Sequence, residues 1–369
     1  MIFCNFFKNL FSPKTVFKHG RKAVFVTLFG KTFRLISNKV TVSKKSLSDC
    51  VHSFKVPLFL SDYFYYFRKL PAFSFDYALH SDRYTSEKTA IVMQGPLMLD
   101  YRFTYETLAI YQKTILNNNP NVVLILSTWE NEDAHEIECI KGLGVEVVQS
   151  PDVGFSWGNL NRQITSTMAG LKRANELGCK YVIKTRTDQR FYAPNIIEFL
   201  FNILKTFPLD KTAKCVKNRL VSLSFNSFKN RLYGVSDMFL FGALDDVTRY
   251  WNVPLNAYQP KPEDKTPFED FKESCAETFV CRHFLQGLGE AVSDDIRHTY
   301  EMYAKYFCFV DKETVEMFWP KYSNMNSRWE SFDNPALEEM KFRDWLNLYV
   351  RGGKNEDWAE KKYFDMPEI

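Results

Sequence analysis

The clearest absence in this chain of 369 residues is a long, unbroken apolar run. A membrane-spanning helix needs about 20 consecutive, mostly apolar residues, and no stretch of the sequence provides them. The first ten residues are interrupted by Asn5 and Lys8, so they are too polar for the apolar core of a secretion signal. The sequence therefore predicts a cytoplasmic protein.

Cys-x-x-Cys pairs and common cofactor motifs are also missing. The eight cysteines are spread along the chain without a Cys-x-x-Cys, which is typical of reduced thiols in a reducing compartment. The sequence has no P-loop, no dinucleotide-binding fingerprint and no recognisable nucleophile triad. These absences argue against P-loop nucleoside triphosphatases and nicotinamide-dependent oxidoreductases.

Acidic residues are absent from positions 1–48, which carry ten lysines and arginines among several phenylalanines. Such a segment can bind an anionic inner-membrane surface, at about 1 kcal/mol per nearby cation. A solvated basic arm explains the pattern equally well. No recognisable nucleic-acid-binding motif accompanies the segment, so we expect no nucleic-acid partner. With this segment, the predicted localisation becomes cytoplasmic with peripheral attachment to the inner membrane.

The rest of the chain alternates between short apolar runs and amphipathic stretches, which predicts an α/β fold. We expect strands at 89–93, 121–128, 145–149, 181–185, 220–225 and 233–242, and helices at 103–115, 133–143, 159–177, 194–204 and 274–287. Strands that alternate with helices indicate parallel βαβ units in an open, mostly parallel sheet flanked by helices.

Three regions are expected along the chain. Residues 1–85 are predicted to be a basic, aromatic and β-rich N-terminal extension, with strands around the Gly30-Lys31 turn. Residues 86–325 are predicted to be the catalytic domain, which includes a proline-rich loop at 252–267. Residues 326–369 are predicted to be a C-terminal helical segment.

The strand that begins at Tyr181 runs, without Gly or Pro, into Lys184, Arg186, Asp188 and Arg190. Alternation along an extended chain would place these four side chains on one side. Unpaired charge is expensive to bury, so we expect them at the carboxyl edge of the sheet, where ligands bind open α/β folds. Cations around one carboxylate suit a phosphorylated ligand. The alternative is a local Arg–Asp pair that ties down a loop.

The first predicted strand ends in Gln94-Gly95-Pro96. A glycine at this place lets the backbone approach a ligand closely, and the Gln94 amide could recognise a base or a ribose. Ordinary turn formation by Gly-Pro is the alternative.

Asn161, Arg162 and Gln163 stand at the start of the clearest predicted helix. Free amides and the helix dipole favour anions there, and Arg162 can donate two hydrogen bonds to a phosphate. We therefore expect these residues to contact a ligand, whereas N-capping by Asn159 is the simpler structural explanation.

Three carboxylates are candidates for chemistry. Asp188 could ligate Mn²⁺ or Mg²⁺ through hard oxygen atoms, although one carboxylate is not a strong metal site. Asp237 stands alone in an apolar run and Glu277 lies near a predicted helix start, so either could deprotonate an acceptor hydroxyl. Asp237 could instead bind the acceptor, and Glu277 could be an ordinary first-turn glutamate.

Four blocks of residues, at 91–97, 126–130, 159–167 and 182–190, occur in an order and spacing that resemble the WavE lipopolysaccharide-synthesis family of bacterial glycosyltransferases. The resemblance extends over roughly 88–325 and includes the later segments 236–242, 276–279 and 318–322. Four ordered blocks are far more specific than any one of them.

The resemblance implies a GT-A-like enzyme that transfers sugar from a nucleotide-sugar donor to a lipid-linked acceptor, a lipopolysaccharide or lipooligosaccharide core or a related surface glycan. GT-A enzymes commonly carry Asp-x-Asp at the strand end where this chain has Arg186-Thr187-Asp188. Arg186 and Lys184 could therefore neutralise the diphosphate leaving group themselves. A nucleotidyl- or phosphotransferase and a non-catalytic glycan-assembly protein are the alternative functions.

Overall fold

The computed structural model describes residues 87–116, 119–193, 195–259, 272–319 and 338–354. All of them belong to the unit Phe67–Ile369. The predicted N-terminal extension and its two strands lie outside the described residues. The boundaries of the three predicted regions stay predictions.

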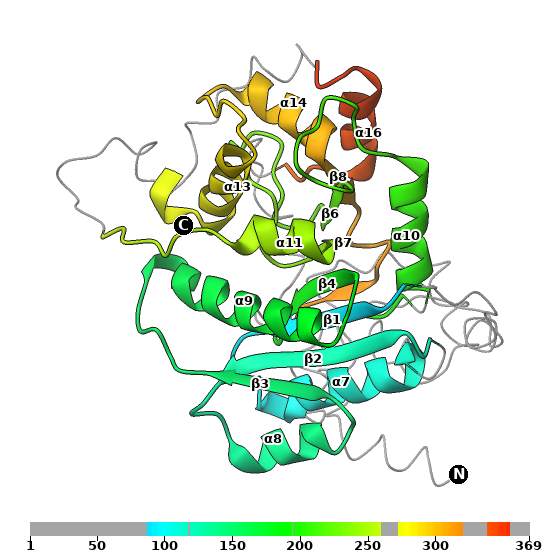
Figure 1. Cartoon of the computed structure of the whole chain (residues 1–369), viewed down its shortest axis with the longest axis vertical. Helices are drawn as coiled ribbons and strands as arrows, with labels where there is room; N and C mark the ends of the chain where they lie inside the picture. The colour runs from blue at the N-terminus through cyan, green and yellow to red at the C-terminus, as the bar shows by residue number, and fades with distance from the viewer. Residues whose placement is uncertain (1–86, 117–118, 194, 260–271, 320–337, 355–369) are drawn as a thin grey trace, which may run out of the picture. The chain divides into compact units, whose positions relative to one another are not determined.

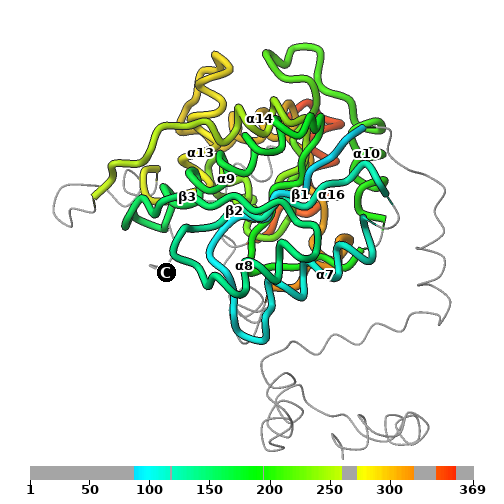
Figure 2. The backbone as a smooth tube through the Cα atoms, turned by 60° about the horizontal axis from the view of Figure 1, so that its bottom comes forward, coloured from blue at the N-terminus to red at the C-terminus, as the bar shows by residue number. Residues whose placement is uncertain are grey.

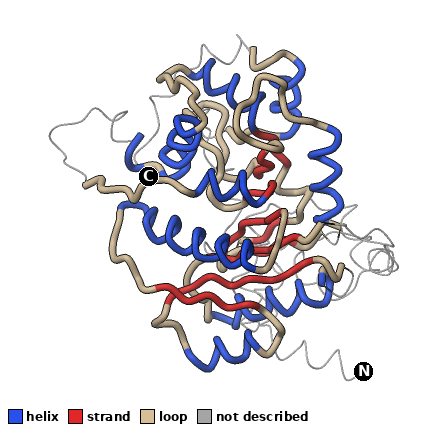
Figure 3. The backbone as a smooth tube through the Cα atoms, viewed as in Figure 1, coloured by secondary structure: helices blue, strands red, loops and turns tan. Residues whose placement is uncertain are grey.

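A seven-stranded sheet forms the centre of the described part of the chain (Figures 1 and 3). Its strands are β1 (Thr89–Gln94), β2 (Val122–Trp129), β3 (Glu146–Ser150), β4 (Tyr181–Arg186), β6 (Leu220–Leu223), β7 (Leu240–Ala243) and β8 (Phe307–Val310). They are ordered β3-β2-β1-β4-β7-β6-β8. Strand β7 is antiparallel to both of its neighbours, and the other paired strands are parallel. The predicted α/β class with a mostly parallel sheet is confirmed.

Helices cover both faces of this sheet. They are α7 (Phe103–Thr114), α8 (Ala134–Lys141), α9 (Leu160–Glu176), α10 (Ile196–Thr206), α11 (Leu244–Trp251), α13 (Ala276–Gly287), α14 (Ile296–Tyr306) and α16 (Phe342–Val350). Helix α9 lies on one side of β1–β3, and α7 and α8 lie on the other (Figures 1 and 2). No helix in the described ranges is long and apolar enough to cross a membrane.

The close fit of α9 on the sheet depends on Gly170. A Cβ atom at this position would lie 2.4 Å from Val92 Cγ1 and 3.1 Å from Ser127 Cβ, so only glycine permits the observed approach. The Ser127 hydroxyl donates to the Ser166 carbonyl at 2.6 Å, which fixes α9 against the carboxyl half of β2. The start of α9 is thereby held above the strand ends.

Strand order reverses between β1 and β4. From β1 the chain proceeds outward to β2 and β3, and then returns through α9 to place β4 on the opposite side of β1. Loops diverge at such a switch point, and ligands bind open α/β sheets there, outside the carboxyl ends of the strands.

The second half of the sheet differs from its prediction. The expected strand at 233–242 is wrong in extent, because β7 contains only Leu240–Ala243 and the preceding buried residues are irregular. Tyr233 has a φ of 50°, in the left-handed region, which interrupts an extended chain. Helices α11 and α14 and strand β8 were not predicted.

Candidate functional site

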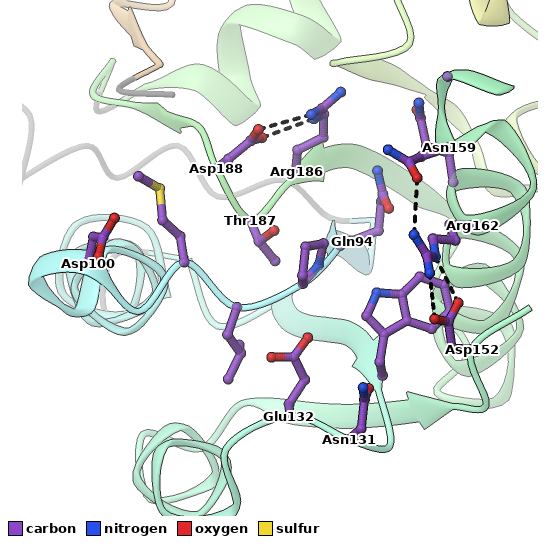
Figure 4. A pocket seen from close by; sticks show the side chains of 17 residues that line it. Gln94, Asp100, Asn131, Glu132, Asp152, Asn159, Arg162, Arg186, Thr187 and Asp188 are labelled. Carbon is purple, nitrogen blue, oxygen red and sulfur yellow. Dashed lines mark hydrogen bonds and ion pairs between the residues drawn. The ribbon is translucent and has the colours of Figure 1, made fainter. Parts of the chain in front are cut away.

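A pocket of about 690 Å³ opens at the carboxyl ends of β1, β2, β3 and β4 (Figure 4). The loops that follow these strands form most of its wall, and the start of α9 completes it. The predicted residues that line it are Gln94, Gly95, Pro96, Arg162, Gln163, Arg186 and Asp188. Five other predicted site residues, Asn161, Lys184, Arg190, Asp237 and Glu277, do not belong to its lining.

Gly95 joins the ends of β1 and β4. Its φ is +124°, and a Cβ atom there would lie 2.8 Å from Thr187 Oγ1, so a larger residue would push the two strand ends apart. The Thr187 amide donates to the Gln94 carbonyl at 3.1 Å, which extends the pairing of β1 and β4 to this point. Gln94 is itself oriented by Ser166, whose hydroxyl donates to Oε1 at 2.7 Å.

Arg186 and Asp188 form a two-pronged ion pair in the pocket wall. Arg186 Nε donates to Asp188 Oδ1, and Arg186 Nη2 donates to Asp188 Oδ2, both at 2.9 Å. Their side chains are only 18% and 17% exposed. Burial acts to lower the pKa of Arg186, but the charges of Asp188 and Asp237 outweigh it and raise the pKa. The guanidinium is therefore a permanent cation in the wall of the pocket.

The donor set around Asp188 does not suit the predicted divalent cation. Both of its carboxylate oxygens accept hydrogen bonds from Arg186, and Oδ2 also accepts from Trp319 Nε1 at 3.1 Å. Among the described residues, no three His, Cys, Asp or Glu side chains form a group that could hold a metal ion. We therefore derive no chemical step through a metal at this carboxylate.

Asp237 lies directly behind the ion pair. Its Oδ2 atom is 3.4 Å from Arg186 Nη1, and its Oδ1 atom accepts from Asn226 Nδ2 at 3.4 Å. The carboxylate is almost fully buried. Asp237 therefore fixes Arg186 from the side away from Asp188.

Glu277 extends the same buried network. Asn226 donates to its Oε1 atom, Cys275 Sγ donates to Oε2 at 3.1 Å, and Arg231 Nη1 lies 3.8 Å from Oε2. Burial raises the pKa of Glu277, Arg231 opposes the rise, and the charge of Asp237 adds to it. The structure thus places the two predicted acids in one network, with Asn226 between them.

Lys184 does not belong to the pocket lining. It is fully buried, its Nζ atom donates to the Asp237 carbonyl, and Nζ lies 4.4 Å from the centroid of the Trp251 ring. Burial lowers the pKa of Lys184 to about 7, although the Asp237 charge opposes that change. Lys184 supports the backbone that carries Asp237.

Arg190 lies on the other side of the sheet. Its Nε atom donates to Thr107 Oγ1 at 2.8 Å, and its guanidinium carbon lies 4.4 Å from the centroid of the Phe103 ring, both in α7. The expectation that all four charged side chains share one side is therefore wrong. Strand β4 ends at Arg186 and the chain turns before β5 (Arg190–Phe191), so strand alternation does not continue.

Asn161 and Arg162 are neighbours at the start of α9, but their side chains have different surroundings. Asn161 points to Asn256, donating from Nδ2 to its carbonyl at 2.9 Å and accepting from its amide at 2.7 Å, so it joins the start of α9 to the loop that contains Asn256. The capping oxygen for the Asn161 amide comes from Ser156 Oγ at 3.0 Å, whereas Asn159 has a left-handed backbone and makes no side-chain cap. The alternative of N-capping by Asn159 is wrong.

Arg162 does line the pocket, and it forms the second ion pair there (Figure 4). Its Nε and Nη2 atoms donate to Asp152 Oδ1 and Oδ2 at 2.8 and 2.6 Å, and Nη1 donates to Asn159 Oδ1 at 3.1 Å. These hydrogen bonds from Arg162 lower the pKa of Asp152. Gln163, one residue further, lines the same wall.

Several pocket residues were missed by the sequence analysis, namely Asp100, Trp129, Asn131, Glu132, Asp152 and Thr187. Glu132 accepts from Thr128 Oγ1 at 3.1 Å, and burial raises the pKa of its carboxyl group. Most of these residues lie at the end of a predicted strand or a few positions after it, so position relative to a strand end was the signal that could have found them.

A family model described as WavE lipopolysaccharide synthesis matches residues 89–366. No curated protein matches the chain.

Three solved structures show weak likeness. A cytidylyltransferase from Leptospira borgpetersenii serovar Hardjo-bovis is 13% identical, with 75% of this chain and 98% of that chain covered and a TM-score of 0.31. A mannose-1-phosphate geranyltransferase from Thermus thermophilus is 15% identical, with coverage of 37% and 41% and a TM-score of 0.24. A glycosyltransferase involved in glycosylation of the major capsid of PBCV-1 is 10% identical, with coverage of 50% and 73% and a TM-score of 0.26. These scores are too low to carry an argument about activity.

Proposed function

Because the chain belongs to the WavE lipopolysaccharide synthesis family, we propose that it is a glycosyltransferase acting on a lipopolysaccharide or lipooligosaccharide core, or a related surface glycan. Its donor would be a nucleotide-sugar bound in the pocket at the carboxyl ends of β1–β4. The observation that carries this proposal is the guanidinium of Arg186 in the wall of that pocket.

Arg186 suits a diphosphate for a geometric reason. A guanidinium has five N–H groups, and three of them make the hydrogen bonds to Asp188 and Asp237 described above. Within the described residues, the other two remain for a ligand in the pocket. Because carboxylates hold Arg186 on two sides, it loses little side-chain freedom when an anion binds. It would also stabilise the negative charge that develops on the leaving diphosphate.

The other pocket residues would hold the remainder of the donor. Gly95 and Pro96 bring backbone to the pocket, and the amides of Gln94 and Gln163 can recognise a ribose or a base. Arg162 is more exposed to water than Arg186, so solvent would screen its charge more strongly from the donor. Asn161, Lys184 and Arg190 would support the site without touching the donor.

Glu277 is our candidate for the general base. In the transfer, the bond between the sugar carbon and the diphosphate oxygen breaks, a bond from the acceptor oxygen to that carbon forms, and the acceptor proton passes to a carboxylate. A raised pKa makes Glu277 a better proton acceptor near neutral pH than an ordinary carboxylate. Asp237 would hold Arg186.

The acceptor would approach from the start of α13. Gly158 lines the pocket, and a Cβ atom built on it would lie 3.7 Å from the Ser274 carbonyl oxygen. The residues just before α13 therefore lie next to the pocket rim. Glu277 lies in the first turn of α13. This arrangement supports an acceptor site between the pocket and the buried network.

We further propose that the enzyme works on the cytoplasmic side of the inner membrane, where the basic residues of 1–48 would hold it near a lipid-linked acceptor. Vesicles of anionic and of neutral phospholipid would test this idea by sedimentation. The full chain should bind only the anionic vesicles. A chain without residues 1–48 that binds equally well would contradict it.

The test of the function is a binding panel followed by a transfer assay. UDP-, GDP-, CMP- and dTDP-sugars would be titrated with and without Mn²⁺ or Mg²⁺, on wild type and Arg186→Lys. A ligand at 100 times its Kd should stabilise the fold by about 2.7 kcal/mol. We expect one nucleotide class to bind, and Arg186→Lys to weaken it. Arg219→Lys is the matched control, because Arg219 is also buried but bonds to the Phe207 and Ala304 carbonyls away from the pocket.

Three results would overturn the proposal. If the protein bound none of the nucleotide-sugars, the pocket would not be a donor site. Turnover of a nucleoside triphosphate without sugar transfer would indicate a nucleotidyl- or phosphotransferase. Binding of a nucleotide-sugar without transfer to extracted lipopolysaccharide acceptors would indicate a non-catalytic glycan-assembly protein.

The same panel tests metal dependence. Retention of donor affinity in the presence of a chelator would support Arg186, in place of a metal, as the cation that binds the diphosphate.

A further inference from the structure

Trp319 reaches the pocket wall from a distant part of the chain. Strand β5 pairs antiparallel with β9 (Met317–Phe318), and Arg190 is the partner of Phe318. Because the pairing is antiparallel, the chain that continues past Phe318 runs back toward Asp188. Trp319 Nε1 accordingly donates to Asp188 Oδ2 at 3.1 Å, across 131 residues of sequence.

The indole of Trp319 is fixed independently of this hydrogen bond. It is nearly fully buried, and its ring packs edge-on against Phe225 at a centroid distance of 5.3 Å. An indole has a single N–H donor, and here that donor is directed at the carboxylate that holds Arg186. A rigid ring therefore determines where one oxygen of Asp188 lies.

The position of Asp188 in turn determines the direction of Arg186. The two parallel hydrogen bonds between them require the guanidinium and the carboxylate to lie in a common plane. Rotation of Asp188 would break this geometry, and among the described residues Arg186 would then be held only by the longer contact to Asp237. The guanidinium of Arg186 would then no longer keep a fixed position in the pocket wall.

We infer that Trp319 is a positioning residue for the phosphate-binding site, acting through Asp188 on Arg186. This inference rests on the proposed function for the nature of the natural ligand, a nucleotide diphosphate group. The clamp formed by Trp319, Asp188 and Arg186 would bind any diphosphate anion in the same way. Asp188 takes the role of an orienting carboxylate in this clamp, at the strand end where a metal ligand was expected.

The test measures binding of inorganic pyrophosphate and of nucleoside diphosphates to the full chain by calorimetry. Trp319→Phe keeps the ring packing and removes only the N–H donor, so we expect the pyrophosphate Kd to rise about 5- to 10-fold. Trp345→Phe is the matched control. Its indole also donates a buried hydrogen bond, to the Tyr303 carbonyl at 3.2 Å, but far from the pocket. It should lower thermal stability and leave the Kd unchanged.

A double-mutant cycle identifies the route of the effect. If Trp319 acts through Asp188, then Trp319→Phe should add nothing to the Kd of a protein that already carries Asp188→Ala. If the double variant instead showed the two single increases in Kd multiplied together, the inference would be overturned, because Trp319 would act on the ligand by another route. Equal pyrophosphate affinity in wild type and Trp319→Phe, or no pyrophosphate binding by wild type, would also overturn it.

The same titrations separate this inference from the proposed function. If pyrophosphate binds and depends on Trp319 while no nucleoside diphosphate or nucleotide-sugar binds, the clamp stands and the proposed donor is wrong. If Trp319→Phe does not fold, the indole N–H signal of Trp319 in wild type provides the measurement, assigned by its displacement in Asp188→Asn. This signal should shift when pyrophosphate binds. An unmoved signal in a protein that binds pyrophosphate would overturn the inference.

Discussion

Two Arg–Asp pairs line one pocket, with the same two-pronged geometry and very different surroundings (Figure 4). Arg162 and Asp152 are 34% and 37% exposed, whereas Arg186 and Asp188 are 18% and 17% exposed. Water can hydrogen-bond to either side chain of the first pair in place of its partner. The second pair leads inward, through Asp237 and Asn226, to Glu277.

This difference in burial separates two kinds of contribution. Exposed ion pairs contribute little to stability, because solvent and salt screen them. A buried pair is expensive to break, since the charge that remains cannot be solvated. The buried network is therefore expected to control affinity, catalysis and pH dependence, and the exposed pair to adjust the rim of the pocket. Substitutions in each of the two pairs, and in the network behind the buried one, can test that division.

Glu277→Gln tests the inner end of the buried network. If Glu277 takes the acceptor proton, kcat should fall about 10²- to 10⁴-fold while donor affinity is retained. Because burial raises the pKa of Glu277, the wild-type rate should fall with acid at a higher pH than for an ordinary glutamate, and the variant should lose this limb. A pH–rate profile measures both effects.

A remote glutamate supplies the control for that experiment. Glu290 has similar side-chain burial and binds Lys305 at 2.8 Å, outside the pocket. Glu290→Gln should retain kcat. If Glu277→Gln changed donor affinity and not kcat, Glu277 would be a structural member of the network, and the base would lie elsewhere.

The two arginines can be compared directly by parallel substitution with lysine. Lysine keeps the charge but lacks the planar fork. We expect Arg186→Lys to weaken nucleotide binding roughly 100-fold, because charge-assisted hydrogen bonds are lost and the buried acids lose a partner. Arg162→Lys should weaken binding only about 3-fold, or roughly 0.7 kcal/mol. Equal losses, measured by calorimetry, would contradict the proposed division between buried and exposed pairs.

The sequence predicted the half of the fold in which each element has its own local signal. Strands β1–β4 are apolar runs bounded by turn residues, and α9 has a clear apolar stripe that ends before Gly178. The location of the pocket followed, because the carboxyl ends of parallel strands meet at one edge. For the same reason, Arg186 and Gly95 were identified correctly as residues near that edge.

The parts that failed depend on tertiary contacts or on weak local signals. Nothing near Thr187 in the sequence marks the turn that sends Arg190 to the other side of the sheet. Helix α11 has Leu244, Val247 and Trp251 at helical spacing, but it follows β7 directly, without a capping side chain. The contact between Trp319 and Asp188 spans 131 residues, so no local pattern contains it.

Lys184 gives the buried network a pH dependence near and above neutrality that the exposed pair lacks. Its pKa is about 7 in the folded protein, against 10.5 for an ordinary lysine. Between about pH 7.5 and 9 the amine is therefore mostly neutral when folded and charged when unfolded, so unfolding takes up about one proton. Stability then rises with pH, by about 2 kcal/mol over this window.

Chemical denaturation at several pH values measures this effect. Lys184→Met should remove the rise, and Lys217→Met, which changes a surface lysine paired with Asp245, should retain it. Well below its folded pKa of about 7 the amine is charged in both states, so the slope should disappear there. An identical pH slope in wild type and Lys184→Met would show that Lys184 does not titrate in this range.

The smallest effect is expected at the exposed pair. Asp152→Asn removes the carboxylate charge beside Arg162, and both partners of this pair remain accessible to water. Its Tm should therefore lie within about 2 °C of wild type at low salt, and the difference should vanish near 1 M salt, where the screening length is about 3 Å. Asp188→Asn, measured in parallel, should lower Tm further and by the same amount at both salt concentrations, because a buried pair is screened much less. A salt-independent loss in Asp152→Asn would mean that the exposed pair is as rigid as the buried one, and that burial does not distinguish the two sides of the pocket.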